Sequence, residues 1–249
     1  MIEKLNEIKK FLELNKQYNH ELQQKFAQKS LTNAKEPFDK LVALLYDTID
    51  TQSRPNINRT YKFMTKIFEA KDSLDSFDGF FEFIVHKSVS EFNNKNIYEQ
   101  LFSNMKKQSG WGPKTSALLI KNIYNYHHSF DIQELKIWND VPKVSDNNDI
   151  LNVPVDAVIF AIFMKLDSKT NFTFEKINKI LQDNFTNNEI ILFDDLWFWG
   201  FITQKGGRDR TYEWNEEKYW SIKESQKDEN ILKNIREKSL EFTNILTSN

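Results

Sequence analysis

Apolar residues recur at three- and four-residue spacing along most of the chain, which is the period of an amphipathic α-helix. The first such stretch places Leu5, Ile8 and Leu12 on one side, and a second begins near Pro37, a residue that suits a first helical turn. Alternating, strand-like patterns are scarce, and the polar connections between the helical stretches are short. The pattern therefore predicts an all-α fold with compactly packed helices.

The helical period is lost between about residues 127 and 152, where polar residues and Pro142 interrupt it. We interpret this segment as an inserted surface loop or short irregular helix, and a loop of this length in a compact domain is usually functional. The next stretch, VPVDAVIFAIFMKL, is apolar on every face. It predicts a central helix over about 154–166 that is buried on all sides.

Composition narrows the range of functions. The 249 residues are 39% hydrophobic, enough for a substantial core, and 34 Lys and Arg nearly balance 36 Asp and Glu. A formal charge of -2 argues against general coating of nucleic acid, so any DNA contact should be a local basic patch. The absence of cysteine excludes disulfides, thiolate zinc sites and cysteine-ligated iron–sulfur clusters.

Targeting signals are also missing from the pattern. No stretch reaches the roughly 18 to 20 apolar residues that a membrane-spanning helix needs, and the N-terminus lacks the apolar run of a secretory signal. We therefore expect a cytoplasmic monomer without a membrane partner.

One segment carries a recognisable chemical pattern. Residues Ser109 to Leu119 read SGWGPKTSALL, so two helical stretches over about 95–126 flank a turn bracketed by Gly110 and Gly112. Both glycines can adopt positive φ and let the backbone approach a phosphate, while the N-terminus of the following helix points its N–H groups at the anion. The side chains expected to add phosphate contacts are Lys106, Lys107, Thr115 and Lys121.

GWGPKTSALL resembles the hairpin of helix-hairpin-helix DNA-binding modules, whose pattern is G-x-G-x-K-T-A, with Ser116 at the alanine position. Downstream, LNVPVDAV is similar to the hydrophobic-Pro-Val-Asp sequence of the glycosylase branch. Together, over about Ser109 to Phe163, the two motifs resemble the helix-hairpin-helix DNA glycosylase/lyase family. The resemblance implies a single domain over residues 1–249, two helical subdomains flanking a cleft, and no metal or organic cofactor.

The resemblance also implies roles for two residues. Lys114 occupies the position of the family's nucleophile, and Asp156 that of its catalytic carboxylate. The chemistry is coherent, because an amine attacking C1′ of the sugar needs a carboxylate to stabilise the cationic sugar as the base leaves. The implied function is base-excision repair of duplex DNA by a glycosylase that also nicks abasic sites. Taken alone, Asp156 is better explained as a carboxylate that stabilises a helix N-terminus, and the catalytic interpretation depends on its pairing with the hairpin.

Two departures from the family pattern bear on the substrate. The connection between Lys114 and Asp156 is longer than in the endonuclease III type, and no iron–sulfur cluster is possible. The archaeal-type 8-oxoguanine glycosylases also lengthen this connection, so 8-oxoguanine is the favoured damaged base. Val158 stands where the family commonly has a histidine, which puts one phosphate contact in doubt.

An extruded base is usually held by aromatic stacking and hydrogen bonds. Trp138 lies in the insertion, where no helical face requires it, and is therefore the better stacking candidate. At least two of Trp197, Phe198 and Trp199 are expected in the core. Asp194 and Asp195 fit a solvated helix face. The candidates for a base pocket are Gln52, Trp138, Trp197 and Trp199.

Several alternatives remain at this stage. The chain fits a non-catalytic helix-hairpin-helix DNA-binding protein, and it also fits a helical protein whose hairpin packs against a protein partner. Arg208 and Arg210 suit either a phosphate contact or a soluble loop. Adjacent His127 and His128 project in different directions and favour a surface turn over a metal site with Asp131.

Overall fold

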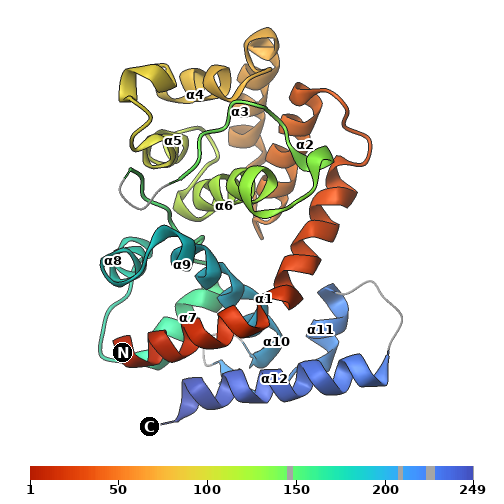
Figure 1. Ribbon diagram of the computed structural model, residues 1–249, viewed down its shortest axis with the longest axis vertical. Helices are drawn as coiled ribbons and strands as arrows, with labels where there is room; N and C mark the ends of the chain where they lie inside the picture. The colour runs from red at the N-terminus through yellow and green to blue at the C-terminus, as the bar shows by residue number, and fades with distance from the viewer. Residues whose placement is uncertain (145–147, 207–209, 223–227, 249) are drawn as a thin grey trace. The chain divides into compact units, whose positions relative to one another are not determined.

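The computed structural model describes residues 1–144, 148–206, 210–222 and 228–248, which are predominantly helical (Figure 1), so the all-α prediction is confirmed. In these ranges, β structure is limited to two short antiparallel strands, β1 (Gln204–Lys205) and β2 (Thr211–Tyr212). Within the same ranges, no helix combines the length and apolarity needed to cross a membrane. The chain divides into two compact units, each assembled from separate parts of the sequence.

Unit 2 comprises Gln23–Pro154 and Thr186–Ile191. Its central helix, α6, packs against both α2 and α5, and α5 also packs against α4. The α-helices lying wholly within the first of these segments are α2 (Pro37–Asp50), α3 (Ile57–Glu69), α4 (Phe77–Val85), α5 (Ile97–Met105) and α6 (Pro113–Tyr124). The single-turn helices are η1 (Lys71–Ser73), η2 (Val89–Phe92), the π-helical η3 (Asn125–Ser129) and η4 (Gln133–Leu135).

Local sequence explains how several of these helices begin. Pro37 starts α2 with its ring in the first turn, where no backbone N–H is needed. The side chain of Asn56 accepts a hydrogen bond from the Arg59 N–H at 3.0 Å, and so caps α3. Ser76 caps α4 in the same way, accepting from the Gly79 N–H at 3.0 Å. These caps are readable in the sequence because each lies three residues before its donor.

The segment over residues 127–152 caps two other helices of unit 2. The Asp140 carboxylate accepts hydrogen bonds from the backbone N–H groups of Phe77 and Asp78 at the start of α4, at 2.8 and 3.0 Å. The buried Asp149 carboxylate accepts from Tyr98 and Glu99 at the start of α5, at 2.8 and 2.9 Å. A loop that satisfies the free N–H groups of two helices is part of the framework of the unit.

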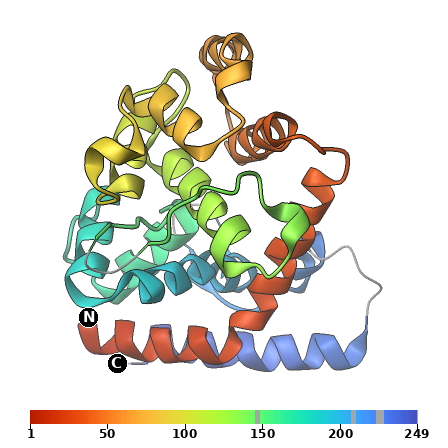
Figure 2. The ribbon, with the colours of Figure 1, turned by 45° about the horizontal axis from the view of Figure 1, so that its top comes forward.

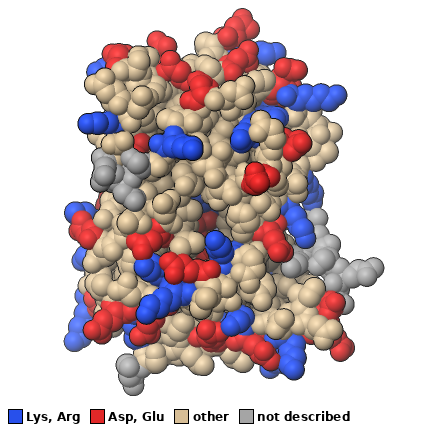
Figure 3. Space-filling model, viewed as in Figure 1, with Lys and Arg blue, Asp and Glu red and all other residues tan. Residues whose placement is uncertain are grey.

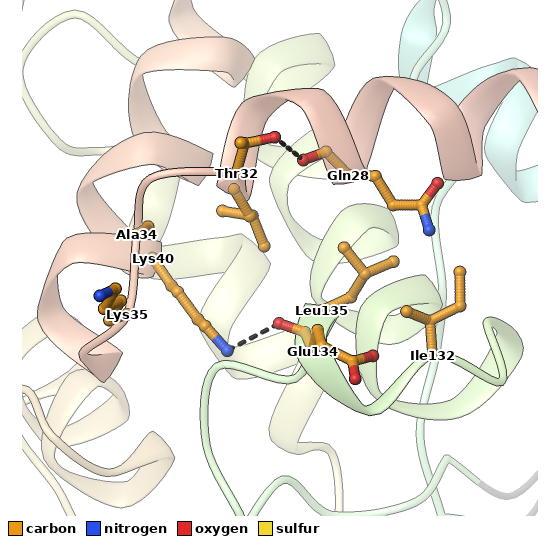
Figure 4. A pocket seen from close by; sticks show the side chains of 9 residues that line it. Gln28, Thr32, Ala34, Lys35, Lys40, Ile132, Glu134 and Leu135 are labelled. Atoms are coloured by element: carbon orange, nitrogen blue, oxygen red, sulfur yellow. Dashed lines mark hydrogen bonds between the residues drawn. The ribbon is translucent and has the colours of Figure 1, made fainter.

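A lysine on α2 also holds the segment over residues 127–152 in place (Figure 4). Lys40 Nζ donates to the carbonyl oxygens of Glu134 and Lys136, at 2.7 and 2.9 Å. Leu135 and Ile137 are buried. Of the two alternatives for this segment, a surface loop is wrong because these side chains belong to the core, whereas a short irregular helix agrees with η4.

Unit 1 comprises Met1–Leu22, Val155–Phe185 and Leu192–Asn249. The two ends of the chain lie side by side in it (Figures 1 and 2), and Lys4 donates a hydrogen bond to the Ser248 carbonyl. The α-helices that lie wholly in unit 1 are α7 (Ala157–Leu166), α8 (Phe174–Asn184), α10 (Leu196–Thr203), α11 (Glu216–Ile222) and α12 (Glu229–Thr247). The single turn η5 (Phe193–Asp195) directly precedes α10. Two helices have residues in both units, α1 (Ile2–Leu31) and α9 (Asn187–Leu192).

Helices α7 and α10 form the centre of unit 1, and they approach most closely at Gly200. A Cβ on Gly200 would lie 2.5 Å from Val158 Cγ1 and 2.9 Å from Ile162 Cδ1, so only glycine fits there. The opposite face of α7 is not covered: Phe160 is partly exposed and Met164 is 36% exposed. The expectation that this helix is buried on all sides is therefore wrong.

Candidate functional site

The turn between α5 and α6, residues 106–112, uses its two glycines for different reasons. Gly110 has φ 89°, the left-handed conformation that was expected, and a Cβ there would lie 3.0 Å from the backbone nitrogen of Thr60. Gly112 is extended, with φ -127°, and does not use the positive φ that glycine allows. A Cβ on Gly112 would have no atom within 4 Å. Gly110 is therefore required by packing against α3, whereas Gly112 leaves open space at the start of α6.

The N-terminus of α6 has the features of an anion site. Gly112 is its N-cap residue, no side chain caps it, and Pro113 occupies the first turn. The first helical hydrogen bond visible at this end joins the Ser116 N–H to the Gly112 carbonyl at 2.9 Å. Uncapped N–H groups and the helix dipole together favour a negatively charged group at such an end.

Lys114 is the second residue of α6 and is partly exposed. Its Nζ donates to the Thr51 carbonyl at the end of α2, at 3.3 Å. Beside it, Gln52 Nε2 donates to the Gly110 carbonyl at 3.4 Å, so Gln52 contacts the turn directly. Thr115 is 5% exposed, so little of it is accessible for the predicted phosphate contact. The end of α2 and the turn thus form one surface around Lys114.

The other lysines predicted to contact DNA differ in how they are held. Lys106 and Lys107 are exposed at the end of α5. Lys106 Nζ lies 5.0 Å from the centre of the Phe102 ring, and Lys107 Nζ donates to Asn104 Oδ1 at 3.1 Å. Lys121, farther along α6, is partly buried and donates to Gln23 Oε1 at 3.2 Å. Lys106 and Lys107 are therefore better placed for phosphate contact than Lys121.

Two segments of unit 2 without acidic residues meet at this turn. Residues 51–68 and residues 100–130 contain no Asp or Glu, and the rings of Phe63 and Trp111 join them with centres 5.3 Å apart. On the face seen in Figure 3, basic and acidic side chains are interspersed. The cations of the first segment were not predicted, although the gap in acidic residues could have revealed them. They are Arg54, Arg59, Lys62 and Lys66.

Asp156 immediately precedes α7 and is its N-cap residue. Its Oδ1 accepts hydrogen bonds from the backbone N–H groups of Val158 and Ile159, both at 2.9 Å. The carboxylate also lines a pocket of unit 1 with a volume of about 780 Å³, together with Phe160, Arg210 and others. Asp156 thus combines a structural cap with access to a pocket.

Lys114 and Asp156 are held in similar ways, although they belong to different units. Each side chain extends from the start of a helix, Lys114 in the first turn of α6 and Asp156 at the cap of α7. The backbone of both is therefore fixed by regular structure. Such positions suit residues that must be held precisely.

Trp138 is a core residue. It is 2% exposed, its Nε1 donates to the Leu74 carbonyl at 3.0 Å, and its ring stacks on Phe80 with centres 5.4 Å apart. The prediction that it is available to stack on a base is therefore wrong. It was misjudged because the segment around it lacks a helical period, although the segment is packed into unit 2.

The other two tryptophans differ in exposure. Trp197 is partly exposed and stacks on Phe201, with ring centres 5.4 Å apart. Trp199 is fully buried against Phe11 and Tyr18, and its Nε1 has no hydrogen-bond partner among the described residues. Trp199 is therefore a core residue, and its assignment to a base pocket is wrong for the same reason as that of Trp138. The assignment of Trp197 stays a prediction.

Three polar residues that were expected at the surface are buried. His127 is 8% exposed and stacks on Trp138, and burial lowers its pKa to about 4. The Ile137 N–H donates to its Nε2 at 3.3 Å, so the ring is neutral. Asp194 and Asp195 are 6% and 9% exposed, which contradicts a solvated helix face.

Arg208 lies outside the described residues. Comparison of the chain with protein-family models, curated proteins and solved structures finds no match. The function must therefore be inferred from the residues of this chain.

Proposed function

We propose that the chain is a DNA glycosylase with abasic-site lyase activity. The observation that carries the proposal is Lys114, in the first turn of an uncapped helix, where two segments without Asp or Glu, residues 51–68 and 100–130, meet. The surface around Lys114 would grip the phosphates of duplex DNA through α6, Lys106 and Lys107. The favoured damaged base is 8-oxoguanine, and the protein would act as a cytoplasmic monomer at the nucleoid.

In this mechanism the amine of Lys114 attacks C1′ of the damaged nucleotide. A bond forms between Nζ and C1′ while the bond from C1′ to the base breaks, and the base leaves with the electron pair and takes up a proton. The nitrogen then loses a proton and the C1′–O4′ bond breaks, with O4′ taking up a proton, so the sugar ring opens and a protonated imine forms between Nζ and C1′. Loss of a 2′ proton expels the 3′ phosphate and nicks the strand.

Asp156 would stabilise the positive charge that develops on the sugar as the base departs. Its hydrogen bonds to two backbone N–H groups of α7 fix the carboxylate in one orientation. The proposal requires one substrate to contact both residues, and hence both units.

Borohydride trapping tests the proposal directly, because it reduces the imine to a stable protein–DNA crosslink. Duplexes that contain single lesions, 8-oxoguanine or an abasic site among them, should give a covalent band with the wild-type protein. Lys114→Gln should abolish the band, whereas Lys121→Gln, which removes the same charge from the same helix, should retain it. Asp156→Asn should slow base release and leave DNA binding intact.

The lesion panel also tests the substrate. Release of uracil or alkylated purines without action on 8-oxoguanine would overturn the favoured base and keep the enzyme class. Absence of a crosslink with every lesion would overturn the catalytic role of Lys114.

A non-catalytic DNA-binding protein is the second candidate, favoured by two contacts with structural explanations. Lys114 bonds to the Thr51 carbonyl, and Asp156 caps α7. This candidate predicts salt-dependent DNA binding without any crosslink. A protein that binds no duplex at all would instead point to a protein partner for the turn.

A further inference from the structure

The pocket that Asp156 lines has a composition suited to a nucleotide. It runs along the face of α7 that was expected to be buried, and Phe160 and Met164 contribute apolar surface. Tyr212 of β2 adds a second ring, and its hydroxyl donates to the Ala161 carbonyl at 2.7 Å, which fixes its position. An apolar helix face left uncovered beside a carboxylate is a typical ligand surface.

A buried glutamine positions a guanidinium in this pocket. Gln204 is fully buried, its Nε2 donates to the Val158 carbonyl at 3.1 Å, and its Oε1 accepts from Arg210 Nη1 at 2.6 Å. Arg210 is thereby held next to the first turn of α7. A guanidinium carries five N–H donors, so the bond to Gln204 leaves capacity for an anion.

The charges of the pocket favour a monoanion. Among the described residues, Lys165 and Arg210 line it together with a single carboxylate, Asp156. One phosphodiester would balance the excess cation, and the rings of Phe160 and Tyr212 would contact the attached sugar or base. Val158, at the position where the glycosylase pattern has a phosphate-contacting histidine, is buried and cannot serve.

We propose that this pocket binds a phosphodiester, with its adjacent nucleoside, of the strand processed at Asp156, and that Arg210 makes the phosphate contact. This inference rests on the proposed function and adds a second DNA contact to that of the α5–α6 turn.

The test uses a duplex with a tetrahydrofuran abasic analogue, which binds but cannot react through an imine. Arg210→Gln should weaken its binding about tenfold, the size expected for one charged hydrogen bond. The slope of log affinity against log salt should fall by about one. The affinity of Arg210→Lys for this duplex should lie between those of the wild-type protein and Arg210→Gln, because lysine keeps the charge and lacks the planar guanidinium. Lys205→Gln is the matched control, since Lys205 is exposed and pairs with Glu213 at 3.3 Å.

Methylphosphonate scanning locates the contact. A neutral methylphosphonate at one defined position near the lesion should weaken DNA binding by the wild-type protein. The same substitution should not weaken DNA binding by Arg210→Gln any further, because that variant already lacks the contact. Equal sensitivity of both proteins at every phosphate would overturn the proposal, provided that thermal melts show Arg210→Gln to be folded. The proposal would also be overturned if a free deoxynucleoside monophosphate bound through Arg210 while the affinity for duplex DNA did not depend on Arg210.

Gly112→Asp separates this inference from the proposed function. If Gly112→Asp weakens duplex binding and Arg210→Gln does not, only the pocket assignment fails. If the wild-type protein binds no duplex, the proposed function fails as well.

Discussion

Gly110 lies so close to Thr60 that a Cβ on the glycine would stand 3.0 Å from the threonine backbone nitrogen. Gly110 also has φ 89°, so Gly110→Ala should destabilise the fold by about 1 to 3 kcal/mol. Urea denaturation measures the loss. Gly112→Ala, where the Cβ meets no atom within 4 Å, should cost clearly less, and equal costs would contradict the packing explanation.

Gly112 offers a way to block the anion site without harming the helix. Its extended backbone suits an N-cap residue, so Gly112→Asp should cap α6 and leave stability equal or higher. The new carboxylate would stand where a phosphate is expected, and duplex binding measured by fluorescence anisotropy should fall at least tenfold, roughly one lost charged contact. Gly112→Asn, a neutral cap of the same shape, is the control. Equal binding by the two variants would count against a phosphate at this end of α6.

The carboxylate caps supplied by residues 127–152 should be measurable. Asp149→Ala removes the acceptor for two N–H groups of α5 and should lower the free energy of unfolding by about 1 to 3 kcal/mol. Asp140→Ala should have a smaller effect in the same direction, because the cap on α4 is more exposed. Asp131→Ala, an exposed residue of the same segment, should change stability by less than about 0.5 kcal/mol. Denaturant titration that finds all three alike would refute the capping role.

His127 should make stability depend on pH. Its pKa is about 4 in the folded protein, mainly because of burial, against 6.5 when exposed. As the pH falls, the unfolded chain therefore binds a proton on His127 before the folded protein does. The contribution of His127 to the free energy of unfolding is complete above pH 6.5 and is lost as the pH falls to about 4. The loss should amount to roughly 2 kcal/mol.

Denaturation at several pH values checks this expectation. His127→Gln should flatten the profile between pH 6.5 and 4, whereas His86→Asn, at an exposed left-handed position, should not. An unchanged profile in His127→Gln would assign the pH dependence to other groups.

Trp138 should behave as a core residue. Trp138→Ala should cost about 3 to 5 kcal/mol, because it empties a buried space and leaves the Leu74 carbonyl without its donor. Trp197→Ala, which loses a partly exposed stacking contact, should cost less than half as much. A small effect of Trp138→Ala on stability, combined with a large effect on DNA binding, would restore the stacking interpretation.

The helices were predictable because their signals are local. The apolar period, Pro37 and the glycine turn all lie within a few residues of the structure they specify, and a positive φ within the turn followed from the same reasoning. Which of the two glycines would use this conformational freedom was not predictable, and Gly112 is instead an extended N-cap residue.

The contacts made by residues 127–152 were not predictable from local pattern. Asp140 and Asp149 cap helices that begin some 50 to 60 residues earlier, and nothing in the sequence near them identifies their partners. The exposed face of α7 had the opposite problem, since an apolar pattern predicts burial and cannot distinguish a protein neighbour from a pocket.

Asn187 links the end of the insertion to a much later part of the chain. Its Nδ2 donates to the Asp149 carbonyl at 2.9 Å, and its Oδ1 accepts from the Leu151 N–H at 3.0 Å. Between Pro154 and Thr186 the chain builds part of unit 1, and unit 1 in turn needs residues from both termini. During synthesis, neither unit is complete when its first helices leave the ribosome. A truncated chain ending at Pro154 would lack the ties of Asn187, so unit 2 can be complete only after Thr186–Ile191 have been made, and unit 1 only after Leu192–Asn249.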